Sequence, residues 1–371
     1  MTYNSVMESQ EAEPQFKNEA EIIRTYLPAF EKLNQGKLPE IKGITGEHEG
    51  DISRAWRIIF KPPGKVESCA IFDWDDTLEP YTERKPRLYK SYLSLIPNVN
   101  PTLREKFLNA CKTLNAAARV LPVNGTHPEH YSPLLELVAT SILVKSIQKS
   151  KTPDFLNALT GSQEDESLAR TYLIETVLPK LQDQIGVKEK TKNGSPKKYF
   201  VELANQSTSV RFNEKPSGVD EEVWSIYMRT MTGSNIPADE IDHFDLSENV
   251  RFIVATFGEA GFQLEKVLRG IEAVSAKGRR IPDEILLYTR GRKNPIIEKL
   301  VKEIPEVPFV YVDDSPRQVE SVRGIDRVTP LHAQRQGSKR SSEKVSADIR
   351  EVDMEVTNLS AVARLVEPKK F

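Results

Sequence analysis

The sequence has few cysteines, no long apolar run and no excess of charge of either sign. Its 371 residues include only two cysteines, Cys69 and Cys111, which are too few for a disulfide-held secreted scaffold, so we expect both to be reduced thiols. The longest apolar stretches, such as residues 134–144, fall well short of the ~20 residues that cross a bilayer, and we expect no membrane partner. The 52 basic and 54 acidic residues give a formal charge of -2, which offers no general electrostatic field for nucleic acid.

The amino-terminal segment is polar and acidic. Residues 1–20 carry glutamates where a signal peptide has a basic start followed by an apolar stretch, and we therefore expect a cytoplasmic protein. Because 38% of the residues are hydrophobic and 29% are charged, the composition is typical of a globular chain, and the length corresponds to roughly two to three domains.

Changes of composition along the chain indicate its domain organisation. Residues 1–65 combine helical apolar spacing over 20–33 with a glycine- and proline-rich stretch over 34–50, which predicts an amino-terminal extension made of a helix and a linker. Residues 83–248 are mainly helical in pattern and predict a separate helical domain. Residues 336–371 begin with a basic, polar run and predict a solvated carboxyl-terminal tail.

Residues 66–82 and 249–335 carry the pattern of a parallel β-sheet. An apolar run over residues 69–72 ends abruptly in acidic residues, and after residue 249 short apolar strands alternate with amphipathic helices. This alternation predicts an α/β fold, a Rossmann-like doubly wound parallel sheet with crossover helices. The helical region interrupts this core in sequence, so we expect it to be an inserted domain.

Two acidic motifs stand at the ends of predicted strands. Asp73 and Asp75 follow the first apolar run, and at an extended strand end their carboxylates lie on the same side and converge. Asp313 and Asp314 follow the apolar strand over 308–312. Buried carboxylates that converge repel each other unless a cation lies between them or a proton is shared, and a hard divalent ion such as Mg²⁺ fits oxygen ligands of this kind. An acidic strand exit with chance spacing is the alternative interpretation.

In their order, these motifs resemble those of the haloacid dehalogenase-like hydrolase superfamily. Members carry Asp-x-Asp-x-Thr at one strand end, then a Thr or Ser strand end, a lysine and an acidic strand end. The resemblance covers about residues 67–80 and 250–335. It implies that Asp73 attacks phosphorus to give an aspartyl-phosphate and that Asp75 is the general acid and then the general base. Asp76 departs from the glycine that many relatives have at this position.

The resemblance also assigns the residues that hold the phosphoryl group. Thr256 and Thr289 both stand at ends of predicted strands. If Thr256 is the residue that holds the phosphoryl group, the predicted strands and helices account for every core element of the family. Thr256, with the backbone amides of Phe257 and Gly258, would then bind phosphoryl oxygens, and Lys293 would place its ammonium against the phosphoryl group and the nucleophile. For Thr256, a strand threonine without a ligand is the alternative.

Mg²⁺ is the cofactor that the resemblance implies. Its ligands would be the Asp73 carboxylate, the backbone carbonyl of Asp75, and Asp313, with Asp314 binding directly or through water. The helical insertion stands where the family has a cap domain, which implies a capped phosphatase, a phosphoric monoester hydrolase. Its substrate would be a small phosphorylated metabolite, with a phosphoprotein as the alternative. A catalytically weak binding or regulatory protein, and a phosphotransferase that uses an acceptor other than water, also remain open.

His127 and His130 form the one histidine cluster of the sequence. The spacing His-x-x-His can ligate a transition metal, but no third or fourth ligand is evident near this loop. We therefore expect a surface loop, or side chains that face the substrate, rather than a metal site.

Overall fold

The computed structural model describes residues 14–62, 64–81, 84–97, 99–121, 132–149, 151–162, 164–181, 185–190, 198–203, 215–216, 218–336, 338, 343–355 and 357–365. The chain divides into two compact units. The first comprises mainly Ile23–Arg84 and Thr232–Phe371, and the second mainly Lys85–Met231. The second unit therefore interrupts the first in sequence. Residues 232–248, which we expected in the inserted domain, belong to the first unit.

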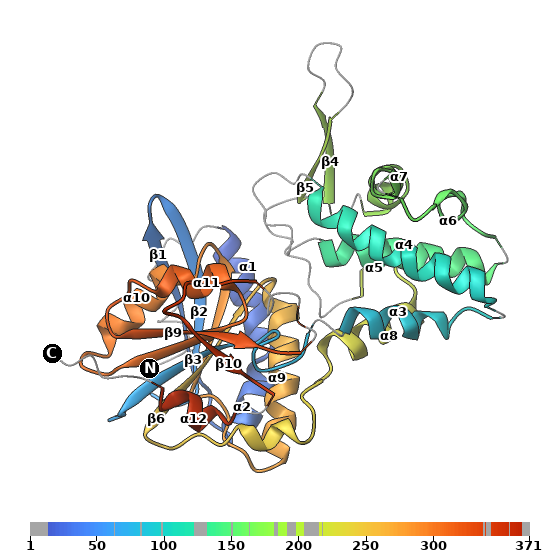
Figure 1. The fold of residues 1–371 in the computed structure, drawn as a ribbon. Helices are drawn as coiled ribbons and strands as arrows, with labels where there is room; N and C mark the ends of the chain where they lie inside the picture. Colours follow the sequence, from blue (N-terminus) through green and yellow to red (C-terminus); the bar gives the residue numbers. More distant parts are fainter. Residues whose placement is uncertain are drawn as a thin grey trace. The chain divides into compact units, whose positions relative to one another are not determined.

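Among the described residues, the first unit contains an eight-stranded sheet with the order β1-β2-β7-β6-β3-β8-β9-β10 (Figure 1). Its strands are β1 (Glu40–His48), β2 (Asp51–Ile59), β3 (Ser68–Asp73), β6 (Val250–Phe257), β7 (Glu284–Arg290), β8 (Phe309–Asp313), β9 (Val328–Gln334) and β10 (Arg350–Asp353). Neighbouring strands from β7 to β10 run parallel, whereas β1 pairs antiparallel with β2 and β2 with β7. The expected α/β class with a mostly parallel sheet is confirmed.

The central strands are apolar because helices cover both faces of the sheet. Residues 69–72 of β3 are fully buried, as is typical of a parallel strand inside an α/β layer. Helices α10 (Asn294–Glu303) and α11 (Pro316–Val322) pack on one face, and helices α2 (Leu27–Leu33) and α9 (Ala260–Ala276) lie on the other (Figure 1). The strand ends that carry the acidic motifs thus belong to the buried centre of the sheet.

The linker expected over residues 34–50 is wrong. Strands β1 and β2 form a hairpin at the edge of the sheet, and its turn residues Glu49 and Gly50 have φ angles of 51° and 82°. A two-residue type I′ turn requires positive φ at both positions. The strand pattern is hard to see in the sequence because Arg54 and Arg57, which are buried in β2, interrupt its apolar residues.

The helix expected over residues 20–33 is present but divided. Helix α1 (Pro14–Thr25) ends before Tyr26, and α2 follows with Pro28 in its first turn. Proline is tolerated there because the first turn of a helix has no internal partner for its N–H groups. The Tyr26 hydroxyl donates a hydrogen bond to the Gly261 carbonyl at 2.9 Å, which ties this region to α9.

The polar tail expected over residues 336–371 is also wrong in part. Strand β10 extends the sheet parallel to β9, and helix α12 (Leu359–Ala363) follows it. Val352, Leu359 and Val362 are buried. These few apolar positions are separated by polar residues, so the composition of the segment hides its contribution to the sheet.

The second unit is mainly helical. Its described elements are α3 (Arg84–Leu93), α4 (Pro101–Val120), α5 (Ser132–Gln148), α6 (Asp154–Ala158), α7 (Glu164–Tyr172), α8 (Glu221–Thr232) and the antiparallel strands β4 (Ile185–Lys190) and β5 (Lys198–Leu203). The buried face of α4 carries Phe107, Ala110, Cys111 and Leu114 at helical spacing. Cys111 and Cys69 are both free, as expected.

No helix in the described part of the chain is long and apolar enough to span a bilayer. His127 and His130 lie outside the described residues.

Candidate active site

The carboxyl ends of β3 and β8 meet where the strand order of the sheet reverses. The two strands are parallel neighbours, with Phe72 opposite Val312, so Asp73 and Asp313 end adjacent strands. From β3 the sheet continues to β6 and β7 on one side, and from β8 to β9 and β10 on the other. In open α/β sheets, ligands bind in the crevice at this point of reversal.

Three carboxylates gather at this point. Asp73, Asp313 and Asp314 each offer one oxygen, and these oxygens all lie within 4.8 Å of one another. All three residues are buried. Lys293 Nζ donates hydrogen bonds to Asp73 Oδ1 and, at 2.8 Å, to Asp313 Oδ2. One lysine among three carboxylates leaves negative charge in a buried site, and the oxygen donors suit a hard divalent cation of the Mg²⁺ type.

The orientation of Asp313 is fixed by three donors. Its Oδ2 accepts from Lys293 Nζ and from the Tyr311 hydroxyl, and its Oδ1 accepts from the Ser315 backbone N–H at 2.8 Å. Tyr311 precedes Asp313 by two residues on β8 and is fully buried, so its hydroxyl reaches the carboxylate from within the sheet. Burial, and then the negative charge of Asp313, raise the pKa of Tyr311 well above its ordinary value, so it acts as a hydrogen-bond donor.

Burial makes ionisation of the nucleophile candidate unfavourable. It raises the pKa of Asp73 to about 7, a shift that Lys293 opposes and that Asp313 and Asp75 increase. Burial acts to lower the pKa of Lys293, but the Asp313 and Asp73 carboxylates outweigh burial and raise it. Lys293 is therefore an ammonium at neutral pH, while Asp73 titrates close to neutrality. A cation beside Asp73 would favour its ionised form.

Asp75 does not join the three carboxylates but faces a different lysine. Lys266 Nζ, on α9, donates to Asp75 Oδ2 at 2.5 Å. Lys266 is fully buried, and burial lowers its pKa, an effect that Asp75 opposes. The other carboxylate oxygen, Asp75 Oδ1, is buried and accepts no hydrogen bond from the described residues. Asp75 thus has one oxygen paired with Lys266 and one buried oxygen with no hydrogen-bond partner among the described residues.

Sequence reasoning missed Lys266. The signal was present, because Lys266 stands four residues after Phe262 and four before Gly270, on the buried face of an amphipathic helix. A lysine on such a face is rarely buried without a charged partner. The position of that partner, Asp75, is 191 residues away in sequence and could not be deduced from the pattern.

The chain turns sharply after Asp73. The Trp74 carbonyl accepts from the N–H groups of Leu78 and Glu79, and Asp76 has a φ of 53°. Asp76 Oδ1 accepts from the Tyr81 N–H at 2.8 Å, which stabilises the turn. The left-handed conformation at Asp76 explains why glycine suits this position, and aspartate is among the residues that tolerate it best.

Of the predicted phosphate-holding residues, Lys293 is bonded to the carboxylates, whereas Thr256 lies on the strand next to β3 and its hydroxyl is bonded elsewhere. Thr256 is on β6, next to β3, whereas Thr289 is on β7, one strand further away. The Thr256 hydroxyl donates to Gln263 Oε1 at 2.8 Å, and no hydrogen bond joins Thr256 to Asp73 or Lys293 among the described residues.

The Gly258 amide, a predicted contact of a phosphoryl oxygen, has a partner within the sheet. This N–H donates to the Tyr288 carbonyl at 3.0 Å, which continues the pairing of β6 with β7 beyond the end of the strand. Gly258 has a φ of 147°, and a Cβ there would lie 2.6 Å from Gln263 Nε2. The φ angle therefore favours glycine at this position, and Phe257 is half-buried at the end of β6.

Fold and site together define an α/β protein with a buried centre of three carboxylates and one lysine at the switch point of its sheet. No protein-family model matches the chain, and no curated protein matches it. The resemblance to the haloacid dehalogenase-like hydrolases therefore depends on the motifs and on the geometry of this centre.

Proposed function

We propose that the protein is a Mg²⁺-dependent phosphatase that acts through an aspartyl-phosphate on Asp73. The observation that carries the proposal is the position of Lys293, whose ammonium joins Asp73 to Asp313 at the ends of adjacent strands. Asp73, Asp313 and Asp314 would hold the cation, together with the backbone carbonyl of Asp75. When bound, Mg²⁺ would neutralise the phosphoryl oxygens that otherwise repel the nucleophile.

Asp73 and Asp75 divide the chemistry between them. Asp73 forms a bond to phosphorus as the bond from phosphorus to the leaving oxygen breaks, and Asp75 gives its proton to that oxygen. Asp75 then takes a proton from water as the water attacks phosphorus, which releases inorganic phosphate and restores the Asp73 carboxylate. The unpartnered oxygen Asp75 Oδ1 supports this role.

Lys293 and Thr256 are the proposed contacts of the transferring group. Lys293 keeps positive charge beside Asp73, which stabilises the negative charge of the phosphoryl oxygens in the transition state. Thr256 is on the strand next to β3, so its hydroxyl would have to exchange Gln263 for a phosphoryl oxygen when substrate binds.

A small phosphorylated metabolite is the proposed substrate class. After the turn that carries Asp75, the chain enters the mainly helical unit and returns to the sheet only at β6. A helical unit inserted at this point is typical of phosphatases whose active site is closed over small substrates, and such closure excludes bulk water from the reaction. A cytoplasmic location and the absence of a nucleic-acid partner remain part of this proposal.

Hydrolysis of an aryl phosphate tests the proposed function. We expect turnover by the wild type that requires Mg²⁺ and is lost in Asp73→Asn. The control is Asp76→Asn, which makes the same change of side chain in the turn, and we expect it to keep most of the wild-type turnover. Full turnover by Asp73→Asn would contradict the proposal. Binding of Mg²⁺ and vanadate without any turnover would favour a binding protein, and transfer to an added alcohol in preference to water would favour a phosphotransferase.

A further inference from the structure

The amino-terminal hairpin borders the strand that leads to Lys293. Strand β2 pairs antiparallel with β7 from Ile59 opposite Glu284 to Arg54 opposite Arg290. Because the two strands run in opposite directions, the start of β2 lies at the carboxyl end of β7. The hairpin therefore reaches the same edge of the sheet as the short loop over residues 291–293, which connects β7 to α10 and carries Lys293.

Two glycines allow the hairpin to approach this loop on both sides of Lys293. A Cβ at Gly46 of β1 would lie 2.7 Å from Pro295 Cβ and 2.9 Å from its carbonyl carbon. A Cβ at Gly291, which has a φ of 77°, would lie 2.6 Å from Ser53 Oγ and 2.7 Å from the Ile52 carbonyl oxygen. Real Cβ atoms essentially never approach heavy atoms so closely, so backbone meets backbone here.

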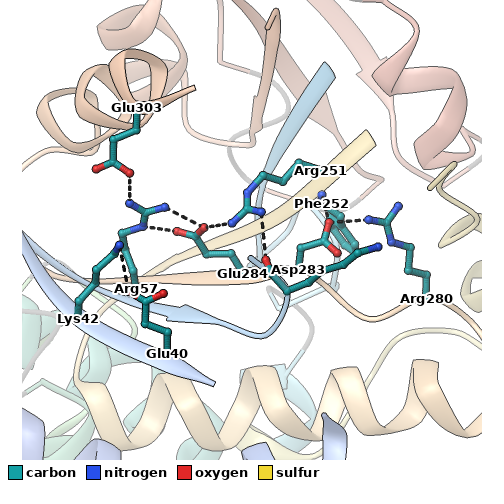
Figure 2. Close-up of polar contacts among 10 residues, drawn as sticks. Glu40, Lys42, Arg57, Arg251, Phe252, Arg280, Asp283, Glu284 and Glu303 are labelled. Atoms are coloured by element: carbon teal, nitrogen blue, oxygen red, sulfur yellow. Dashed lines mark hydrogen bonds and ion pairs between the residues drawn. The ribbon is translucent and has the colours of Figure 1, made fainter. Parts of the chain in front are cut away.

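The same hairpin also holds the far ends of β7 and α10. Arg57 of β2 donates from Nε to Glu284 Oε1 at 2.5 Å, where β7 begins, and from Nη1 to Glu303, where α10 ends (Figure 2). Arg251 of β6 donates to the second oxygen of Glu284 at 2.6 Å. The hairpin thus contacts the segment formed by β7, the loop and α10 at both ends of that segment and on both sides of the loop.

We propose that the amino-terminal hairpin is a brace that positions Lys293 between Asp73 and Asp313. Gly46, Gly291 and Arg57 are positioning residues in this sense, because they act on the loop and not on a ligand. The loop is short and α10 begins directly after Lys293, so a displacement of Pro295 or Gly291 moves the base of the lysine side chain. The consequence for catalysis rests on the proposed phosphatase function, whereas the positioning itself does not.

Amine labelling of single lysines tests the brace without any activity assay. Lys293 is 3% exposed and Lys266 is 0% exposed, and both ammonium groups are paired with carboxylates of the first unit. A short pulse of an amine-reactive ester followed by peptide mass spectrometry reports the labelling of each. We expect Gly46→Ala to raise the labelling of Lys293 by roughly tenfold, since the new methyl group displaces Pro295, and to leave Lys266 unchanged.

Gly50→Ala is the matched control. Gly50 lies in the turn of the same hairpin with a φ of 82°, and nothing lies within 4 Å of a Cβ placed there. This variant strains the hairpin without pushing on the loop, so Lys293 labelling should stay at the wild-type level. Glu303→Gln is a milder second variant, because Glu303 is half-exposed and an exposed ion pair contributes little to stability. We expect about a twofold increase of labelling at Lys293 alone.

The outcomes separate the brace from a general effect on stability. Unchanged Lys293 labelling in Gly46→Ala and Glu303→Gln would overturn the proposal. An equal rise of Lys266 and Lys293 labelling in all three variants would also overturn it, because that result describes loss of stability of the whole unit. A wild type without phosphatase activity would refute the proposed function and leave the labelling result valid. If the protein is a phosphatase, Gly46→Ala should lower kcat more than Gly50→Ala does.

Discussion

The Lys266 ammonium lies 2.5 Å from Asp75 Oδ2. Lys266 is a fully buried residue of α9, and Asp75 lies outside that helix. The pairing leaves the opposite oxygen, Asp75 Oδ1, without a partner among the described residues. Lys266 therefore fixes the orientation of the Asp75 carboxylate. We infer that the lysine positions the proposed general acid and base.

Replacement of Lys266 by methionine should lower the rate of aryl phosphate hydrolysis by roughly 10- to 100-fold, less than the ~10²- to 10⁴-fold that a general acid or base contributes, because Asp75 itself is kept. Methionine keeps the apolar stem and removes the charge. The effect should appear in kcat rather than in KM, because Asp75 acts on the leaving oxygen. Arg269→Met on the exposed side of the same helix is the control, with an expected change of less than twofold. Equal effects of the two variants would argue against the positioning role.

Asp73→Asn should stabilise the protein at neutral pH in the absence of divalent cations. Burial raises the pKa of Asp73 to about 7 in the folded state, above the ordinary value of 3.8. The stability that protonated Asp73 contributes is complete below pH 3.8 and is lost as pH rises through about 7. We expect Asn, which stays neutral, to add about 1 to 3 kcal/mol at pH 8. Thermal unfolding should show little difference between the two proteins at pH 4, and a higher Tm for wild type at pH 8 would contradict this expectation.

Tyr311→Phe should weaken Mg²⁺ binding by roughly tenfold, because a hydrogen bond that orients a ligand carboxylate is lost. Tyr288→Phe is the matched control. Tyr288 is equally buried, and its hydroxyl has no hydrogen-bond partner among the described residues. Titration calorimetry with Mg²⁺ in the absence of substrate compares the two variants. Equal affinities would show that the Tyr311 hydroxyl does not orient Asp313.

Glu284→Gln should destabilise the first unit by about 3 to 5 kcal/mol, because it leaves the Arg57 and Arg251 guanidinium groups buried with too little negative charge. Glu284 is fully buried and accepts from both arginines (Figure 2). Glu303→Gln removes a half-exposed partner of Arg57 and should cost no more than about 1 kcal/mol. Denaturant unfolding measures both variants, and similar losses of stability would contradict the ranking.

The core strands could be predicted because their signals are local. Residues 69–72, the apolar stretch of β6 and residues 309–312 are buried on both faces, so each appears in the sequence as a continuous apolar run. The acidic residues that end β3 and β8 follow directly from these runs. The resulting expectation, that Asp73 and Asp313 lie at one edge of one sheet, agrees with the strand order.

The hairpin and the pairing of Lys266 with Asp75 could not be predicted in this way. Arg54 and Arg57 are charged residues inside β2, and Arg57 is buried against Glu284, which is 227 residues away in sequence. The glycines of β1 indicate a linker by composition, whereas Gly46 is glycine because Pro295 approaches it. Asp73 and Asp75 likewise seemed to converge, but β3 ends at Asp73, and each carboxylate has its own lysine.

The most direct measurement is a search for phosphate covalently attached to the protein during turnover. The protein is mixed with a radiolabelled phosphomonoester and Mg²⁺ and quenched in acid within milliseconds, and the labelled peptide is identified. We expect an acid-stable, hydroxylamine-sensitive label on the peptide that contains Asp73, and none in Asp73→Asn. Turnover without label on that peptide, or label on another residue, would contradict the aspartyl-phosphate mechanism.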